Sequence, residues 1–249
     1  TDGSPDCKTL PVWIQAVAGA YGYGFAECPV GEGPQKGVTR AAPGAGAAQL
    51  VEQVDAEAAA GGFDDVVLAL VLVGMNDVLE LYGLYPATGA DELKKLAEKR
   101  GVTIGDQINR MVDLGAKVIV ATTIDVGLTP YARAQDAKFP GEGRAKLLTD
   151  LTAALNGGVR TTFVNDGRFV GLVYGDEYVQ AATRGVYGLK NVKDPACLET
   201  APLPDCTSLT LVTGAAPQSW LWADDYRPAY DFHLQIGSQA ATRARNSPF

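Results

Sequence analysis

Two segments of this chain combine the residue types that a chemical site needs. In the first, Gly74-Met75-Asn76-Asp77 directly follows the apolar run from Val66 to Val73. An Asn just beyond a buried strand can aim its side-chain N–H into a cleft, where it would stabilise a developing oxyanion. Asn and Asp are also common helix caps, so Asn76 or Asp77 could instead only cap the next helix. Both interpretations stay open here.

The second segment runs from Trp220 to Leu234 and places acids, aromatics and proline before an amphipathic helix. Asp224 and Arg227 stand three residues apart, which allows an ion pair if the segment turns. Triad chemistry needs a base that accepts a proton near neutral pH, and a permanently protonated arginine cannot do this. His233, the single histidine, has Tyr230 rather than a carboxylate three residues before it. That favours a structural role for His233 over a role as base.

Composition excludes several classes of function. The net charge is −8 and there is no Lys/Arg run, which argues against a nucleic-acid partner because phosphate binding needs a basic footprint. The longest apolar run, residues 66–73, is far too short to span a bilayer, so we expect no transmembrane segment. With one histidine and no C-x-x-C pair, the sequence predicts no metal site. It also indicates no cofactor and no particular oligomeric state.

The four cysteines fall into two near-neighbour pairs, Cys7 with Cys28 and Cys197 with Cys206. Short loops in Gly/Pro-rich surroundings are typical of disulfides in an exported protein, secreted or periplasmic. The alternative is four free thiols. We expect the two local disulfides.

Alternating helical and strand patterns predict an α/β fold. Continuous apolar runs at 66–73, 117–122 and 169–173 are typical of strands buried on both faces. We expect helices over 11–20, 47–60, 91–114 (broken near Gly101), 143–155 (ended by Gly157-Gly158) and 234–245. This order predicts a three-layer α/β/α sandwich with a mainly parallel sheet, in a single domain over residues 1–249. The chain opens in a helix, although such a sheet normally begins with a central strand.

Together, these segments resemble the SGNH/GDSL hydrolase family, in particular its larger bacterial secreted lipases and esterases. Gly74-Met75-Asn76-Asp77 is similar to the family's G-x-N-D block, and Asp224-Asp225-Tyr226-Arg227-Pro228 to its D-x-x-H-P block, with Arg227 in the histidine position. Ala42–Ala47 is similar to the glycine block, and Pro11–Gln15 to a Pro-Val-Trp stretch. His233 stands where many members carry another histidine. The resemblance runs from about Pro11 to Ala241, nearly the whole chain.

The resemblance implies a flavodoxin-like SGNH fold and a small-molecule or lipid ester as substrate. Asn76, with a backbone donor at Gly44 or Gly46, would form the oxyanion hole, and these groups should share one cleft at the carboxyl ends of the strands. Asp224 would orient the base. Because Arg227 replaces that base, we expect Asp224 to pair with Arg227.

The family's nucleophile lies in G-D-S-[L] after the first strand, and this sequence has no such motif. Asp2-Gly3-Ser4 is only superficially similar, because no strand precedes Ser4 and Trp13 follows too closely. Either the first strand and serine lie upstream of Thr1, or they have been lost. The first case predicts an ester hydrolase.

Loss of the nucleophile instead predicts a catalytically inactive SGNH-fold protein with a secreted binding or structural role. A third interpretation is a carbohydrate- or polymer-binding module, with Trp13, Trp220 and Trp222 as contact platforms. Aromatic side chains more often fill cores, however.

Overall fold

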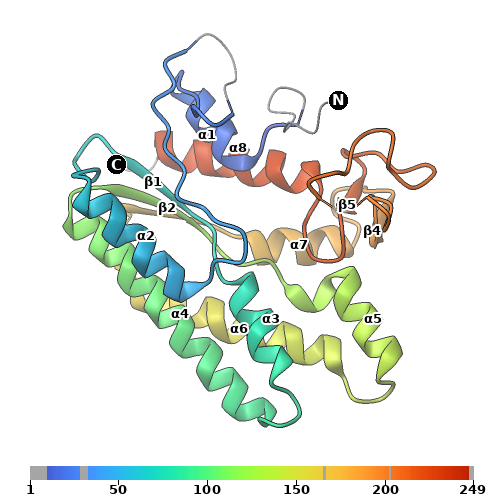
Figure 1. Ribbon diagram of the computed structural model, residues 1–249. Coiled ribbons are helices and arrows are strands. Elements are labelled where there is room, and N and C mark those ends of the chain that lie inside the picture. Colours follow the sequence, from blue (N-terminus) through green and yellow to red (C-terminus); the bar gives the residue numbers. More distant parts are fainter. Residues whose placement is uncertain (1–9, 29–32, 165–166, 202, 247–249) are drawn as a thin grey trace.

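The computed structural model describes residues 10–28, 33–164, 167–201 and 203–246. Its centre is a parallel sheet of β1 (Leu68–Val71), β2 (Lys117–Ala121) and β3 (Val170–Val173), in that order (Figure 1). Within the described ranges, β1 is paired on one side only. The expected α/β class with a parallel sheet is confirmed.

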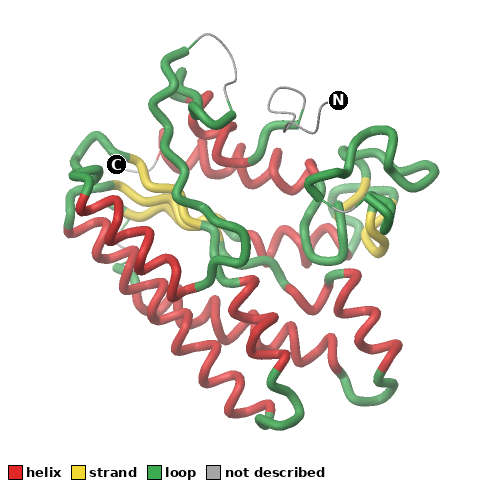
Figure 2. Tube along the Cα trace, viewed as in Figure 1, coloured by secondary structure: helices red, strands yellow, loops and turns green. Residues whose placement is uncertain are grey.

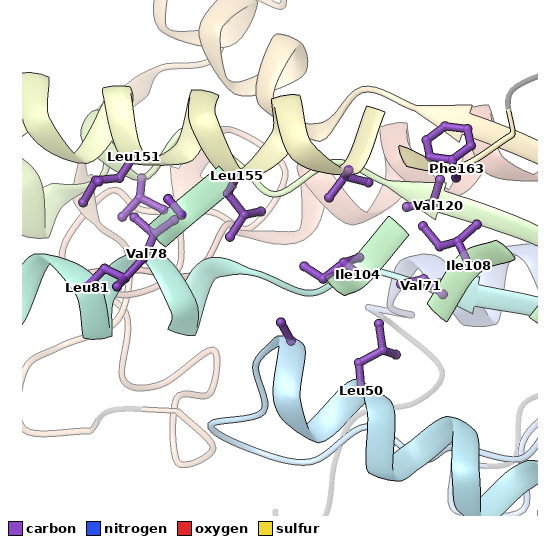
Figure 3. Close-up of a cluster of buried hydrophobic side chains, with 14 of the residues drawn as sticks. Leu50, Val71, Val78, Leu81, Ile104, Ile108, Val120, Leu151, Leu155 and Phe163 are labelled. Carbon is purple, nitrogen blue, oxygen red and sulfur yellow. The ribbon is translucent and has the colours of Figure 1, made fainter. Parts of the chain in front are cut away.

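Helices cover both faces of this sheet (Figure 2). Side chains of β2 alternate between two cores: Val118 and Val120 belong to one, Ile119 and Ala121 to the other. The first core is closed by α2 (Ala47–Ala59), α4 (Ala90–Asp113) and α6 (Arg144–Thr162), and Figure 3 shows its apolar side chains. The second core is closed by α1 (Trp13–Ala20), α7 (Gly175–Thr183) and α8 (Tyr230–Asn246).

Shorter elements follow the strands and complete the fold. The sequence patterns did not predict α3 (Met75–Gly83), η1 (Val126–Leu128), α5 (Pro130–Lys138) or α7, which are too short for a clear period. β4 (Asn191–Pro195) and β5 (Trp220–Trp222) form a separate two-stranded parallel sheet beside α7. Part of the stretch that the sequence left irregular is therefore a strand.

Two expectations about glycine were wrong. We expected a helix over 143–155 ended by Gly157-Gly158 and a break near Gly101, but α6 continues to Thr162 and α4 is unbroken. The reason is the close crossing of these two helices. A Cβ at Gly101 would lie 2.0 Å from the Leu155 carbonyl oxygen, and a Cβ at Gly158 would lie 2.3 Å from the Glu98 carbonyl oxygen. The glycines allow close contact between helices and do not end them.

The expected disulfide between Cys197 and Cys206 is confirmed, with 5.7 Å between the Cα atoms. Cys28 is disulfide-bonded too. Its expected partner, Cys7, lies outside the described residues, so that pairing stays a prediction. In the part of the chain that the structure describes, no helix has the length and apolarity to cross a membrane.

Substitution of the two neighbouring glycines of α6 tests this packing. Gly158→Ala should lower the free energy of unfolding by about 1–3 kcal/mol, because the new methyl group meets backbone of α4 and forces the helices apart. Gly157→Ala meets nothing within 4 Å and should be neutral or stabilise by up to about 1 kcal/mol through helix propensity. Urea unfolding measures both. Equal effects at the two positions would contradict the close-crossing account.

Candidate functional site

The segment after β1 forms a tight turn that glycine makes feasible. Gly74 has φ +124°, and a Cβ there would lie 2.4 Å from Thr123 Oγ1 and 2.8 Å from Leu155 Cδ2. Any side chain would be strained and would collide with its neighbours. Helix α3 then begins at Met75, which places Asn76 and Asp77 in its first turn at the carboxyl end of the sheet.

Asn76 lies beside the glycine segment, as the resemblance implied, and the expected shared cleft stays a prediction. Its Nδ2 donates to the Ala45 carbonyl oxygen at 2.8 Å, across 31 residues of sequence. A side-chain amide nitrogen carries two protons, and this hydrogen bond uses one of them. Gly46 N–H donates to Gln49 Oε1 at 3.0 Å, so Gly44 is the better candidate for a backbone donor. The oxyanion role of these groups stays a prediction.

Asp77 holds the glycine segment in place. Its carboxylate is 4% exposed and accepts the backbone N–H of Ala47 at 3.0 and 3.2 Å. The alternative interpretation, that Asn76 or Asp77 caps the following helix, is wrong: no described side chain caps the start of α3, and Asp77 instead caps the N-terminus of α2. A Cβ at Gly46 would lie 2.8 Å from Asp77 Oδ2, so a larger residue there would force the carboxylate to shift.

Arg100 balances the negative charge of Asp77, and no sequence motif marks this arginine. Arg100 Nη1 lies 3.3 Å from Asp77 Oδ1, and the same guanidinium makes two hydrogen bonds to Glu80, at 2.8 and 2.9 Å. Burial raises the pKa of Asp77, and the Ala47 N–H and Arg100 oppose that shift. The Arg100 hydrogen bonds lower the pKa of Glu80.

The second segment forms a turn, residues 223–228, that we call the Asp224 turn. Its base is a short antiparallel ladder: Trp222 bridges Pro228, and Ala223 N–H donates to the Arg227 carbonyl oxygen at 2.8 Å. Asp224 Oδ1 accepts the backbone N–H groups of Tyr226 and Arg227, at 2.9 and 2.6 Å. Asp224 Oδ2 lies 3.4 Å from Arg227 Nε. The expected Asp224–Arg227 pair is confirmed.

A row of three tyrosines connects the Asp224 turn to the helix that carries Asn76. Tyr131, in the first turn of α5, donates its backbone N–H to the Asp225 carbonyl oxygen at 3.1 Å. Its ring lies 4.8 Å from the Tyr226 ring and meets Tyr82, near the end of α3, edge-on at 6.0 Å. No motif marks these tyrosines, because the residues that meet are far apart in sequence.

His233 has none of the partners that a catalytic base needs. Its ring is partly buried, its Nδ1 is buried without a hydrogen-bond partner among the described residues, and burial lowers its pKa to about 4. The nearby carboxylate of Asp231 accepts instead from the Tyr178 hydroxyl. This geometry agrees with the structural role that the sequence favoured.

Polar side chains at the carboxyl ends of β2 and β3 hold the fold together. Asp176 accepts from Thr122 Oγ1 at 2.6 Å, from Asn156 Nδ2 at 3.1 Å and from Arg160 Nη2 at 2.8 Å. The space beside Thr123 and Asn156 is too small for a water molecule. Thr122, Thr123 and Asn156 are therefore tightly packed, whereas the Arg160 side chain at the edge of the network is partly exposed.

Other candidates from the sequence do not join the site. Ser4 lies outside the described residues, and the described serines, Ser208, Ser219 and Ser238, do not follow the carboxyl end of any strand. Trp13 and Trp222 are buried, so they cannot act as binding platforms for a polymer. No group of three metal-ligating side chains occurs among the described residues.

Comparison with protein-family models gives no match, and a search of curated proteins gives no significant match.

The Asp77 clamp gives a matched pair of substitutions. Asp77→Ala leaves the buried Ala47 N–H without an acceptor and should lower the free energy of unfolding by about 1–3 kcal/mol. Glu80→Ala removes only the exposed partner of Arg100 and should cost less than about 1 kcal/mol. Urea unfolding of both variants measures the difference. A loss as small for Asp77→Ala as for Glu80→Ala would show that the clamp does not hold α2.

His233 gives a pH-dependent prediction. The pKa of its imidazole is about 4 in the folded protein against a reference value of 6.5, so between these values the unfolded chain binds a proton that the folded protein does not. The free energy of unfolding should fall by about 1 kcal/mol per pH unit as the pH drops through this window. Above it, His233 is neutral in both states and adds no pH dependence.

A His233→Phe variant keeps a buried ring but cannot titrate. Its stability should depend less steeply on pH than that of the wild type, and chemical unfolding at several pH values shows the difference. Parallel curves for the two proteins would mean that His233 also binds its proton in the folded state.

Proposed function

We propose that this chain is the greater part of an SGNH/GDSL-type ester hydrolase, with the three-layer α/β/α fold of that family. The observation that carries the proposal is the hydrogen bond from Asn76 Nδ2 to the Ala45 carbonyl oxygen. It brings a G-x-N-D asparagine and a glycine segment together at the carboxyl end of β1. An ester carbonyl oxygen there would accept the second Asn76 amide proton and the N–H of Gly44, which stabilises the tetrahedral oxyanion.

In this proposal the protein is exported, and the Cys197–Cys206 disulfide supports that setting. The nucleophile comes from a serine outside the described residues, because no described serine has the strand-end position that exposes one. Attack of such a serine on the carbonyl carbon also requires a base, likewise from outside the described residues, that takes up its proton. Arg227 cannot be that base, because a guanidinium stays protonated.

A second candidate is a catalytically inactive protein of the same fold that binds esters or related ligands. The Asp224–Arg227 pair favours it, since an arginine occupies the place of the base and engages the carboxylate that would orient a histidine. His233 Nδ1 favours it as well, because this buried nitrogen has no hydrogen-bond partner in the described part of the chain. Both candidates share carbonyl binding at Asn76 and differ only in chemistry.

NMR of the Asn76 side-chain amide tests the shared element. Phenyl acetate, a neutral ester, should shift the Nδ2H2 signal of Asn76 in a saturable way. Asn109 is the matched control, because its Nδ2 donates to the Thr162 carbonyl oxygen at 3.0 Å, near the opposite end of the sheet. Its signal should not move. A stationary Asn76 signal at the solubility limit of the ester would exclude the carbonyl-binding role.

Labelling with a fluorophosphonate probe, read by intact mass, tests the chemistry. This chain alone should stay unlabelled, since no described serine is placed as a nucleophile. Stoichiometric labelling of one of its serines, abolished by change of that serine to alanine, would contradict this. The natural full-length protein separates the two candidates: labelling there supports the hydrolase, and its absence supports the inactive binding protein.

A further inference from the structure

The Asp224 turn shares its hydrogen-bonded ladder with the disulfide Cys197–Cys206. Cys197 N–H donates to the Ala223 carbonyl oxygen at 2.9 Å, and Ala223 N–H donates to the Arg227 carbonyl oxygen at 2.8 Å. Ala223 is therefore held by a disulfide cysteine on one side and by the far end of the turn on the other. The Arg227 N–H in turn binds Asp224 Oδ1.

Noncovalent packing holds the loop between the two cysteines only weakly. None of the described residues from 198 to 206 is buried, whereas Cys197 itself is 7% exposed. The loop is fixed mainly by the disulfide and by a few backbone hydrogen bonds, such as Leu198 N–H to the Thr210 carbonyl oxygen at 2.8 Å. Segments with few buried contacts open locally at low cost. The disulfide is the covalent restraint on this loop, beside backbone hydrogen bonds that pair Ala196 to Leu198 with Thr210 to Val212.

Repulsion between acidic side chains of the loop and of the Asp224 turn opposes their contact. Glu199, two residues after Cys197, lies close enough to Asp225 to repel it, and the pKa of Asp225 is raised by burial and by repulsion from Asp224 and Glu199. Like charges separate when the chain is free to move. The disulfide therefore holds the loop against the turn in spite of this repulsion.

We propose that the Cys197–Cys206 disulfide positions the Asp224 turn, so that Asp224 and the side chain at position 227 keep their geometry only in the oxidised protein. A dithiol would release it: two electrons and two protons pass to the two sulfurs, which become thiols, while the dithiol closes to a disulfide. This role of the disulfide concerns the shape of the turn and does not depend on ester binding. It can therefore fail while the proposed function holds, and the proposed function can fail while it holds.

Amide hydrogen exchange of the full chain tests it. Cys197→Ser with Cys206→Ser should speed exchange of the Ala223 and Arg227 N–H groups at least about tenfold. The Thr122 N–H, which donates to the Val173 carbonyl oxygen at 2.9 Å in the central sheet, should keep its rate. Cys7→Ser with Cys28→Ser is the matched control and should leave the Ala223 and Arg227 rates unchanged.

A second readout follows the side chains. In an Arg227→His background, Asp224 should raise the pKa of the introduced imidazole by about one unit above its usual 6.5. Adding dithiothreitol should return this pKa toward 6.5. In the control, which carries Cys197→Ser and Cys206→Ser in addition to Arg227→His, dithiothreitol should leave the pKa of the imidazole unchanged. NMR titration of the imidazole measures each value.

Each outcome decides the proposal. Faster exchange limited to the Asp224 turn, with a pKa that falls on reduction, supports it. Unchanged exchange at Ala223 and Arg227 overturns it. Equal loss of protection at Thr122 also overturns it, because the disulfide would then serve the stability of the whole fold and not the position of this turn.

Discussion

The close crossing of α4 and α6 fixes the layer on which the candidate site is built. With hydrogen atoms in place of side chains at Gly101 and Gly158, backbone of one helix contacts backbone of the other. That contact positions Leu155 and Asn156 of α6 against the carboxyl ends of the strands. Leu155 closes the space under Gly74, and Asn156 binds both the N–H and the carbonyl oxygen of Thr123. The position of α3, and with it Asn76, follows from this packing.

Buried charge in the first half of the site is compensated within the site. A carboxylate as buried as Asp77 is costly unless it is hydrogen-bonded and paired. The Ala47 N–H and Arg100 supply both conditions. Because the N-terminus of a helix favours negative charge, the same contact stabilises α2. Asp77, which belongs to the G-x-N-D block, therefore serves the fold, and Asn76 beside it makes one hydrogen bond from Nδ2, to the Ala45 carbonyl oxygen.

The second half of the site depends on different supports. The Asp224 turn begins at the end of β5, contacts Tyr131 at its tip, and shares its ladder with Cys197 at its base. Arg227 is 54% exposed at its side chain, so its pair with Asp224 adds little stability, and it is the backbone N–H bonds to Asp224 that shape the turn. The tyrosine row through Tyr82 then relates this turn to α3.

The sequence by itself determined the strands, the approximate positions of the longer helices and the Cys197–Cys206 pair, because local period and short spacing are displayed directly by a single chain. The neighbourhood of Asn76 and the glycine segment, far apart in sequence, was expected only from the resemblance to a hydrolase family. Tertiary structure decided the rest. Gly157-Gly158 looked like a helix end, because whether a glycine ends a helix or lets another helix approach depends on a partner far away in sequence. Arg100, Tyr131 and the target of Asp77 were invisible for the same reason: their roles are set by residues that only folding brings into contact.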